Sequence, residues 1–218
     1  MYGSYAPSKA QKHLLTAMHF VALVLAAWLI FGFGENWRGQ GEARRFLMLA
    51  CLFIYFVRLR LTTYVFIKRT MEWGEVVIIS FWILIFSVFY AAPVRHSSWS
   101  FDWVDAVGIF LFVAGSFLNS YSEYQRMKWK NRPENKGHLY QAGLFRYSRH
   151  INYFGDVVSF TGISIISRSW FTAWIPVAML LGFVIVNVPM LDKYLAEKYA
   201  LEWPEYASRT KRFVPFVY

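Results

Sequence analysis

Six apolar stretches of roughly bilayer-spanning length constrain this 218-residue chain more than any other feature. They cover residues 14–33, 46–67, 75–93, 104–120, 151–167 and 170–189. A helix needs about 20 apolar residues to cross the hydrocarbon core of a bilayer. Because lipid offers no partner to a backbone polar group, a helix is the structure that such a stretch can form. We therefore expect an all-α, polytopic integral membrane protein with about six transmembrane helices, forming a single domain over residues 1–218.

Composition supports a membrane protein, since 57% of the residues are hydrophobic and only 17% are charged, against the roughly 25% charged residues usual in soluble domains.

Individual stretches have features of their own. The fifth stretch is short and contains Asn152 and Asp156, so a partly buried or interfacial helix is an alternative there. Pro189 is expected to end or bend the sixth stretch. The first stretch is long and has no small-residue cleavage site, which predicts a membrane anchor and not a removed signal peptide. Cys51 is the only cysteine, so no intrachain disulfide is possible.

The 23 Lys and Arg residues are unevenly distributed between the segments that flank the stretches. Most lie in the connection over residues 121–150, in the tail after residue 190 and in other segments on the same predicted side. The positive-inside rule therefore predicts cytoplasmic N- and C-termini. The net charge of +10 also favours contact with membrane lipids that carry anionic headgroups. Nucleic acid is a poor partner because the basic residues are split among loops without a nucleic-acid-binding fold. A phosphate-bearing cofactor from the cytosol fits them better.

Charged and polar residues also lie inside the first two stretches. Arg58 and Arg60 are two residues apart and so project from different faces of a helix. Both arginines can snorkel to the cytoplasmic interface, and this explanation fits Arg60 better than the more deeply placed Arg58. Tyr55 precedes Arg58 by one turn, so the phenol is either a proton donor or half of a structural hydrogen-bonded pair. His19 has no acidic neighbour in the sequence, which is typical of a core histidine.

Polar residues recur at helical spacing where the fourth stretch ends. Asn119, Glu123, Arg126 and Lys130 are expected along one face of a helix. An ion pair between Glu123 and Arg126 on a solvated helix end would explain part of this pattern, at a few tenths of a kcal/mol. The amide of Asn119 lies so close to the hydrocarbon that we expect it to have a defined partner.

The stretch over residues 143–156 carries the densest group of chemically useful side chains. Arg149, His150 and Asn152 are expected in the first turn of a helix, where free backbone amides and nearby cations favour an anion. Asp156 follows Asn152 by one turn, on the same face. A capping cluster at an interfacial helix is the alternative. The sequence has no Rossmann, Walker, zinc-binding or nucleophile-elbow motif, so no metal is expected and the chemistry must lie among membrane helices.

The order of these motifs resembles that of a known membrane enzyme family. Residues 143–156 and 205–218 are similar to the C-terminal region of NADPH-dependent steroid 5α-reductases and sterol double-bond reductases. Residues 149–156 follow the sterol reductase pattern. Residues 55–58 and 119–123 resemble motifs of the 5α-reductases, with a glutamate in place of an aspartate in the second. The resemblance spans the chain from about residue 50 to its last residue.

The resemblance implies a cofactor site formed mainly by residues 119–218 and a substrate chamber formed mainly by helices in 14–120. NADPH would contact Arg58, Arg69, Asn119, Glu123, Arg126, Arg149, His150, Asn152, Asp156 and Tyr194, with Arg58 and Arg69 near its phosphates. Tyr55 would be the catalytic residue, as a proton donor or carbonyl polariser, in the reduction of a carbon–carbon double bond. The substrate implied is a steroid-like lipid, with a 3-keto-4-ene steroid first, and another enone lipid or an isolated sterol double bond still open.

The chain departs from the 5α-reductases at the glutamate on an N-terminal helix that helps to bind the 3-keto group. Glu35 and Glu42 are expected in a loop on the side opposite the cofactor, and neither is a secure counterpart. The resemblance further implies an endoplasmic reticulum membrane in a eukaryote or an inner membrane in a bacterium, with the cofactor site facing the cytoplasm. It does not predict an oligomeric state.

Two other functions remain open. The isoprenylcysteine carboxyl methyltransferases, which use S-adenosylmethionine, have a related C-terminal core. They typically show Arg-His-Pro-x-Tyr and a later Glu-Glu pair, whereas this chain has Ile151 in place of the proline and no such pair. A non-enzymatic lipid-binding membrane protein is the other alternative, and it would be favoured if the basic residues bound only headgroups.

Overall fold

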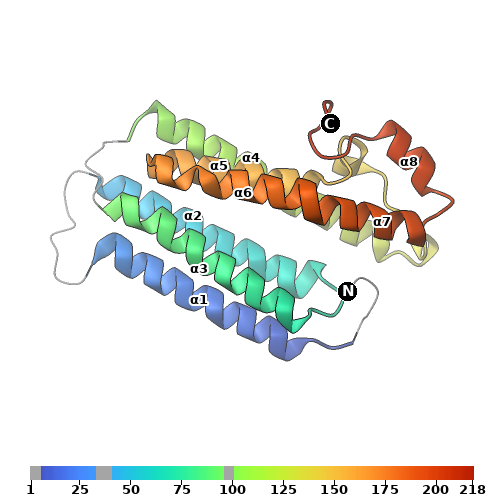
Figure 1. Ribbon diagram of the computed structural model, residues 1–218, viewed down its shortest axis with the longest axis horizontal. Coiled ribbons are helices and arrows are strands. Elements are labelled where there is room, and N and C mark those ends of the chain that lie inside the picture. The colour runs from blue at the N-terminus through green and yellow to red at the C-terminus, as the bar shows by residue number, and fades with distance from the viewer. Residues whose placement is uncertain (1–5, 33–40, 96–100) are drawn as a thin grey trace. The chain divides into compact units, whose positions relative to one another are not determined.

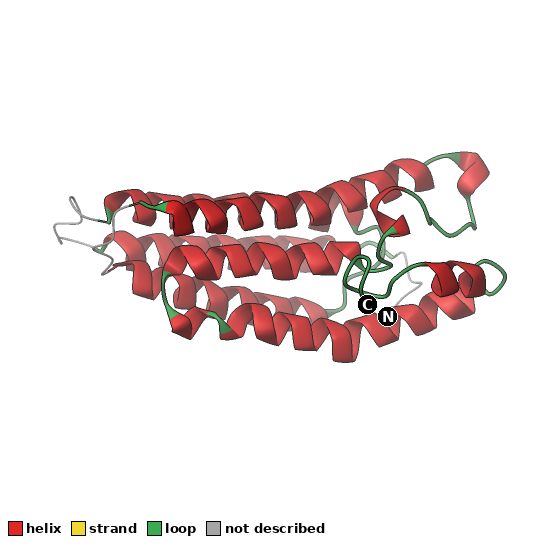
Figure 2. Ribbon diagram, turned by 90° about the horizontal axis from the view of Figure 1, so that it is seen from above, coloured by secondary structure: helices red, strands yellow, loops and turns green. Residues whose placement is uncertain are grey.

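The computed structural model describes residues 6–32, 41–95 and 101–218. In these ranges the chain consists of helices joined by loops, without a β-strand (Figure 2). Two compact units are formed, and each contains two separate parts of the sequence. Unit 1 comprises Met1–Phe110 and Thr161–Ile175, and unit 2 comprises Leu111–Phe160 and Pro176–Tyr218. The all-α architecture predicted from the apolar stretches is confirmed.

Unit 1 is built around three long helices, which are labelled in Figure 1. They are α1 (Lys9–Phe31), α2 (Glu42–Leu61), which continues as a π-helix over Thr62–Phe66, and α3 (Trp73–Arg95). α1 packs against both α2 and α3, and the small residues Ala22 and Ala26 of α1 are fully buried. Small residues let helices approach closely in a membrane, where van der Waals packing replaces the hydrophobic effect as the driving force. Glu42 is the first residue of α2, so its expected loop position is corrected, whereas Glu35 lies outside the described residues.

A buried ion pair joins α2 to α4 (Trp103–Lys130) within unit 1. Arg44 Nε donates to Asp105 Oδ1 at 3.1 Å and its Nη2 donates to Oδ2 at 2.7 Å. Both side chains are almost completely buried. A buried charge that loses its partner is very costly, so removal of either residue should destabilise the fold.

α4 and α5 (Ile151–Ser167) contribute to both units, since the unit boundaries fall inside them at Phe110 and Phe160. α4 is long and apolar enough to cross a bilayer, as are α1, α3, the α2 helix with its π-helical extension and the segment Trp170–Lys198. α5 has 17 residues and is shorter than each of these five segments. Among the described residues, five helical segments thus reach spanning length, as is typical of a multi-pass membrane protein.

The last span is longer than the sequence predicts. α6 (Trp174–Gly182), a π-helix over Phe183–Asn187 and α7 (Val188–Lys198) follow one another without a break, and α8 (Trp203–Arg209) comes after a turn. Pro189 lies in the first turn of α7, directly after the π-helix. A π-helix within an α-helix changes the hydrogen-bond register, so the helical segment can continue past a proline that lacks a backbone N–H. Pro189 therefore does not end the helical segment.

Candidate functional site

Two glycines bring α4 and α5 unusually close together within unit 2. A Cβ atom placed on Gly155 of α5 would lie 2.7 Å from the backbone nitrogen of Asn119 and 2.7 Å from the carbonyl oxygen of Gly115, both on α4. Real Cβ atoms do not approach other atoms so closely. A Cβ on Gly115 would likewise clash with the Gly155 carbonyl. The two helix backbones can be neighbours at this level only because neither residue has a side chain.

This close approach places five of the expected site residues in one hydrogen-bonded group. The side-chain Nδ2 of Asn119 donates to the backbone carbonyl oxygen of Asn152 at 3.1 Å and to Asp156 Oδ2 at 3.0 Å. Asn152 Nδ2 donates to Glu123 Oε1 at 2.9 Å. Arg126 donates to the other oxygen of Glu123. We call Asn119, Glu123, Arg126, Asn152 and Asp156 the Asn119 cluster. It contains two carboxylates and one guanidinium, so it can bind hydroxyl, amide and anionic groups.

His150 lies directly before α5 and is completely buried. Its Nε2 is 2.8 Å from Asp192 Oδ1, on α7. A carboxylate can only accept, so Nε2 carries the proton and Nδ1 of the neutral ring has a free lone pair. Nδ1 is buried and has no hydrogen-bond partner among the described residues. Burial lowers the pKa of His150 below its usual value, which favours this neutral form.

Asp192 is a member of the site that sequence reasoning missed. Besides His150, its carboxylate accepts from Arg212 Nε at 2.9 Å, and Arg149 Nη2 lies 3.9 Å from it. An acidic residue in an otherwise apolar span is energetically costly unless it is paired. This cost was the sequence signal from which Asp192 could have been identified. Asp192 lies just beyond the expected end of the sixth stretch at residue 189, so the expected boundaries place this residue outside the membrane.

The C-terminal tail is bound to the turn that precedes α5. The Arg149 amide donates to the Lys211 carbonyl at 2.9 Å, and the Ser148 hydroxyl donates to the Phe213 carbonyl at 2.7 Å. The buried Tyr206 hydroxyl donates to the Phe145 carbonyl at 2.7 Å. These bonds join two segments that are far apart in the sequence, and they carry the tail to a position from which Arg212 reaches Asp192.

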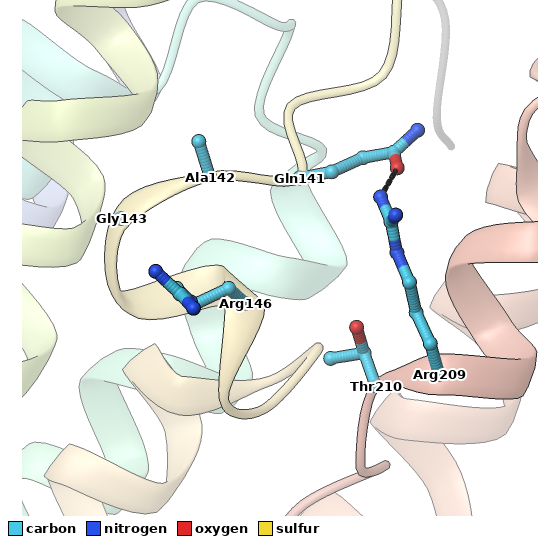
Figure 3. A pocket seen from close by; sticks show the side chains of 6 residues that line it. All are labelled: Gln141, Ala142, Gly143, Arg146, Arg209 and Thr210. Carbon is cyan, nitrogen blue, oxygen red and sulfur yellow. Dashed lines mark hydrogen bonds between the residues drawn. The ribbon is translucent and has the colours of Figure 1, made fainter.

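An open hollow of about 430 Å³ lies beside this junction. It is lined by Gln141, Ala142, Gly143, Arg146, Arg209 and Thr210 (Figure 3). Arg209 Nη2 donates to Gln141 Oε1 at 2.6 Å. Gly143 has a φ of 59°, and a Cβ there would lie 2.7 Å from the Tyr140 hydroxyl oxygen. A glycine is therefore required at this turn, and the two arginines make the hollow attractive to an anion.

Three other expected cofactor residues have described contacts of their own. Tyr194 of α7 accepts a hydrogen bond from Lys198 at 3.0 Å. Arg58 is buried in unit 1, with its guanidinium carbon 5.8 Å from the centre of the Tyr55 ring. Arg69 of the same unit donates from Nη1 to Glu75 Oε2 at 2.8 Å. Glu75 is the first residue of the expected third stretch, and its pairing with Arg69 was not predicted.

Comparison with known proteins places these residues in a family. A family model described as "Protein of unknown function (DUF1295)" matches residues 75–210. The chain belongs to the DUF1295 family. This family covers homologues of the steroid 5α-reductases, so the resemblance stated from the motifs is confirmed. The part of this DUF1295 member that matches the model includes the Asn119 cluster, His150 and Asp192.

Individual relatives are distant. The chain is 23% identical over 120 residues to 3-oxo-5-alpha-steroid 4-dehydrogenase 2 of Rattus norvegicus and 23% identical over 121 residues to that of Homo sapiens. Each match covers 55% of this chain and 45% of the relative, so the chain matches less than half the length of these proteins. It is also 30% identical over 95 residues to "Probable O-methyltransferase ustE" of Ustilaginoidea virens, across 43% of this chain and 33% of that protein. The methyltransferase match agrees with a core that the two classes of enzyme share.

Proposed function

We propose that this protein is a membrane-embedded, NADPH-dependent reductase of a carbon–carbon double bond in a steroid-like lipid. The observation that carries the proposal is the Asn119 cluster beside the turn that holds His150. Distant similarity to the 3-oxo-5-alpha-steroid 4-dehydrogenases supports an oxidoreductase of this kind. The excess of Lys and Arg in the 121–150 connection and the tail supports a cofactor site that faces the cytoplasm.

The donors and acceptors of unit 2 suit a phosphorylated dinucleotide. His150 Nδ1 is a buried acceptor without a partner among the residues that the structure describes, and an uncompensated acceptor of this kind favours a ligand that donates, such as a ribose hydroxyl or a carboxamide. The carboxylates of Glu123 and Asp156 can accept from similar groups. The side chain of Arg126 is 40% exposed, so its guanidinium can bind a phosphate. Arg146 and Arg209 in the hollow offer two further cations.

The reduction requires two electrons and two hydrogens. When bound, NADPH supplies a hydride to the electron-poor carbon of the double bond and leaves as NADP⁺. The protein must supply a proton for the neighbouring carbon and must hold the carbonyl oxygen while negative charge develops on it. We assign the hydrogen bond to this oxygen, or the delivery of the proton, to Tyr55. The apolar helices around Tyr55 exclude water, which strengthens such a bond.

A side-by-side titration of NADPH and S-adenosylmethionine with the detergent-purified protein tests the cofactor. We expect NADPH to bind with micromolar affinity and S-adenosylmethionine to produce no heat or thermal shift. Asn152→Ala or Asp156→Ala should weaken NADPH binding and leave the protein folded, because the lost groups lie in the Asn119 cluster. Asn131→Ala is the matched control, since this asparagine is exposed just after α4 ends. Unchanged affinity in the two cluster variants would remove the cluster from the cofactor site.

A membrane methyltransferase is the second candidate, and the match to a probable O-methyltransferase favours it. The same titration decides between the two. Binding of S-adenosylmethionine without NADPH would replace the reductase by a methyltransferase. If neither cofactor binds, the result would favour a protein that binds lipids without catalysing a reaction.

A further inference from the structure

A second polar group lies inside the apolar helices of unit 1, away from the Asn119 cluster in the sequence. It consists of His19 of α1 and Arg60 and Tyr55 of α2, and we call it the His19 group. His19 is buried, with an exposed fraction of 2%. Arg60 Nη2 lies 3.2 Å from His19 Nδ1, and the centres of the His19 and Tyr55 rings are 5.5 Å apart. α1 and α2 pack against each other, so the group lies at a contact between helices.

The bond between Arg60 and His19 determines which nitrogen of the histidine carries a proton. A guanidinium has five donors and no acceptor, so Arg60 must donate and Nδ1 must accept. The proton of the neutral ring therefore lies on Nε2. In the part of the chain that the structure describes, the bond from Arg60 is the one hydrogen bond of His19. The Nε2–H group is thus a donor without a described acceptor, on a ring that neighbours the Tyr55 ring.

Arg60 also has hydrogen-bond donors without a described acceptor. Its Nε and Nη1 atoms are buried and find no hydrogen-bond partner among the described residues. An arginine that only snorkelled to the membrane surface would place these atoms in water. The guanidinium carbon instead lies 5.0 Å from the centre of the Phe56 ring. No described carboxylate forms an ion pair with Arg60 or His19. The group therefore has an excess of donors in a setting where each unmade hydrogen bond is expensive.

Aromatic carbon surrounds these donors. The His19 ring lies 4.9 Å from the Phe56 ring, and the Tyr55 ring lies 5.3 Å from the ring of the fully buried Phe86 of α3. A ligand that matches this environment has an apolar skeleton and an acceptor oxygen. A ketone of a lipid has both features, whereas a hydrocarbon lacks the acceptor.

We propose that His19 is a substrate-binding residue, whose Nε2–H donates a hydrogen bond to the carbonyl oxygen of a lipid-like ketone beside Tyr55. Arg60 is a positioning residue that holds His19 in the required tautomer and adds a positive potential behind it. This inference rests on the proposed reductase function and extends it to the polar end of the substrate. The hydrogen bond becomes stronger as the oxygen gains negative charge during reduction, so His19 affects turnover as well as binding.

The test compares two ligands that differ only at the oxygen: a 3-keto-4-ene steroid and the same skeleton without the 3-oxygen. Their affinities for the full-length protein in detergent are measured by quenching of tryptophan fluorescence. We expect the wild-type protein to bind the ketone about tenfold more tightly, as one hydrogen bond of about 1.4 kcal/mol would produce. His19→Phe should abolish this preference and lower kcat with the enone. His19→Gln should retain part of both, because its amide can donate from a similar position.

His13→Phe is the matched control. His13 also belongs to α1, but it is exposed and lies 3.1 Å from the Tyr64 hydroxyl instead. It should keep the preference for the ketone. If His19→Phe keeps the full preference, or if the wild-type protein binds both ligands equally, His19 does not bind the oxygen. The second result needs no variant, so the proposal stays testable even if His19→Phe does not fold. Tighter binding of a phosphocholine detergent than of the ketone by the wild-type protein would also refute the proposal and would indicate a site for lipid headgroups.

The outcomes separate this inference from the proposed function. A ketone preference that depends on His19 in a protein that oxidises no NADPH would refute the reductase and leave the His19 site standing. Reduction of the enone by His19→Phe with wild-type kcat and KM would support the reductase and refute the role of His19.

Discussion

Replacement of Gly155 by alanine tests whether the close approach of α4 and α5 creates the Asn119 cluster. The new Cβ would lie 2.7 Å from two backbone atoms, Asn119 N and Gly115 O, whereas ordinary contacts begin near 3.4 Å. Backbone atoms cannot swing aside as a side chain can, so the helices must separate by roughly 0.7 Å. The bond from Asn119 to Asp156, now 3.0 Å long, would then exceed hydrogen-bonding distance.

The expected cost follows from these distances. Overpacking of this kind destabilises a protein by about 1–3 kcal/mol, and for a chain of this size each kcal/mol lowers Tm by about 2–4 °C. We therefore expect a fall in Tm of roughly 2–12 °C for Gly155→Ala, together with weaker NADPH binding. Differential scanning fluorimetry and calorimetric titration measure the two effects.

Gly182→Ala is the matched control for this experiment. Gly182 is also helical and belongs to unit 2, but a Cβ there would meet no atom within 4 Å. Alanine is favoured over glycine in a helix by up to about 1 kcal/mol, so Tm should be equal or higher. If Gly155→Ala keeps the wild-type Tm and the wild-type affinity for NADPH, the close approach is not what positions the cluster.

Four further substitutions probe other parts of the molecule. Tyr55→Phe should lower kcat at least tenfold with little change in the Kd for NADPH, and full activity would refute its role as proton donor. Arg69→Ala should reduce the preference for NADPH over NADH in paired titrations if the Arg69 guanidinium contacts the 2′-phosphate. An unchanged preference would assign Arg69 only a structural role, as the ion-pair partner of Glu75. Asp105→Ala should destabilise the protein by about 3–5 kcal/mol because Arg44 loses the buried carboxylate that accepts from two of its nitrogens, whereas an unchanged Tm would show that this ion pair does not stabilise the fold. For His150, whose pKa is lowered by burial, the unfolded chain binds the proton first, so stability should fall as pH drops below about 6.5. The Tm of His150→Gln should depend less on pH in this range, and equal slopes would contradict the assignment.

Periodicity and residue type were sufficient for the elements that depend on local sequence. The helical face that carries Asn119, Glu123 and Arg126 was predicted from spacing alone, and α4 confirms it. α5 begins at Ile151 and so confirms the helix expected there, although Arg149 and His150 lie in the preceding turn. These features follow from the helical repeat, which the sequence contains directly.

Contacts between distant segments could not be predicted in the same way. Spacing gave no reason to pair His150 with Asp192, because 42 residues separate them. The long helical segment through Pro189 was also missed, since the π-helix before it depends on packing and not on a local motif. The partner of His19 belongs to another helix, and the sequence alone offered a core histidine.

The sequence by itself determined that the chain is a membrane protein, that it is helical and which residue types are available for chemistry. The length of the apolar stretches and the helical period are local properties of the sequence, and these are sufficient for such conclusions. Only the tertiary structure decided which polar groups meet. The glycine contact between α4 and α5 brings Asn119 to Asp156, and the tail brings Arg212 to Asp192. The packing of α1 on α2 gives His19 a cation that fixes its tautomer. Each of these pairings depends on backbone distances between helices, and such distances result from the packing of the folded chain.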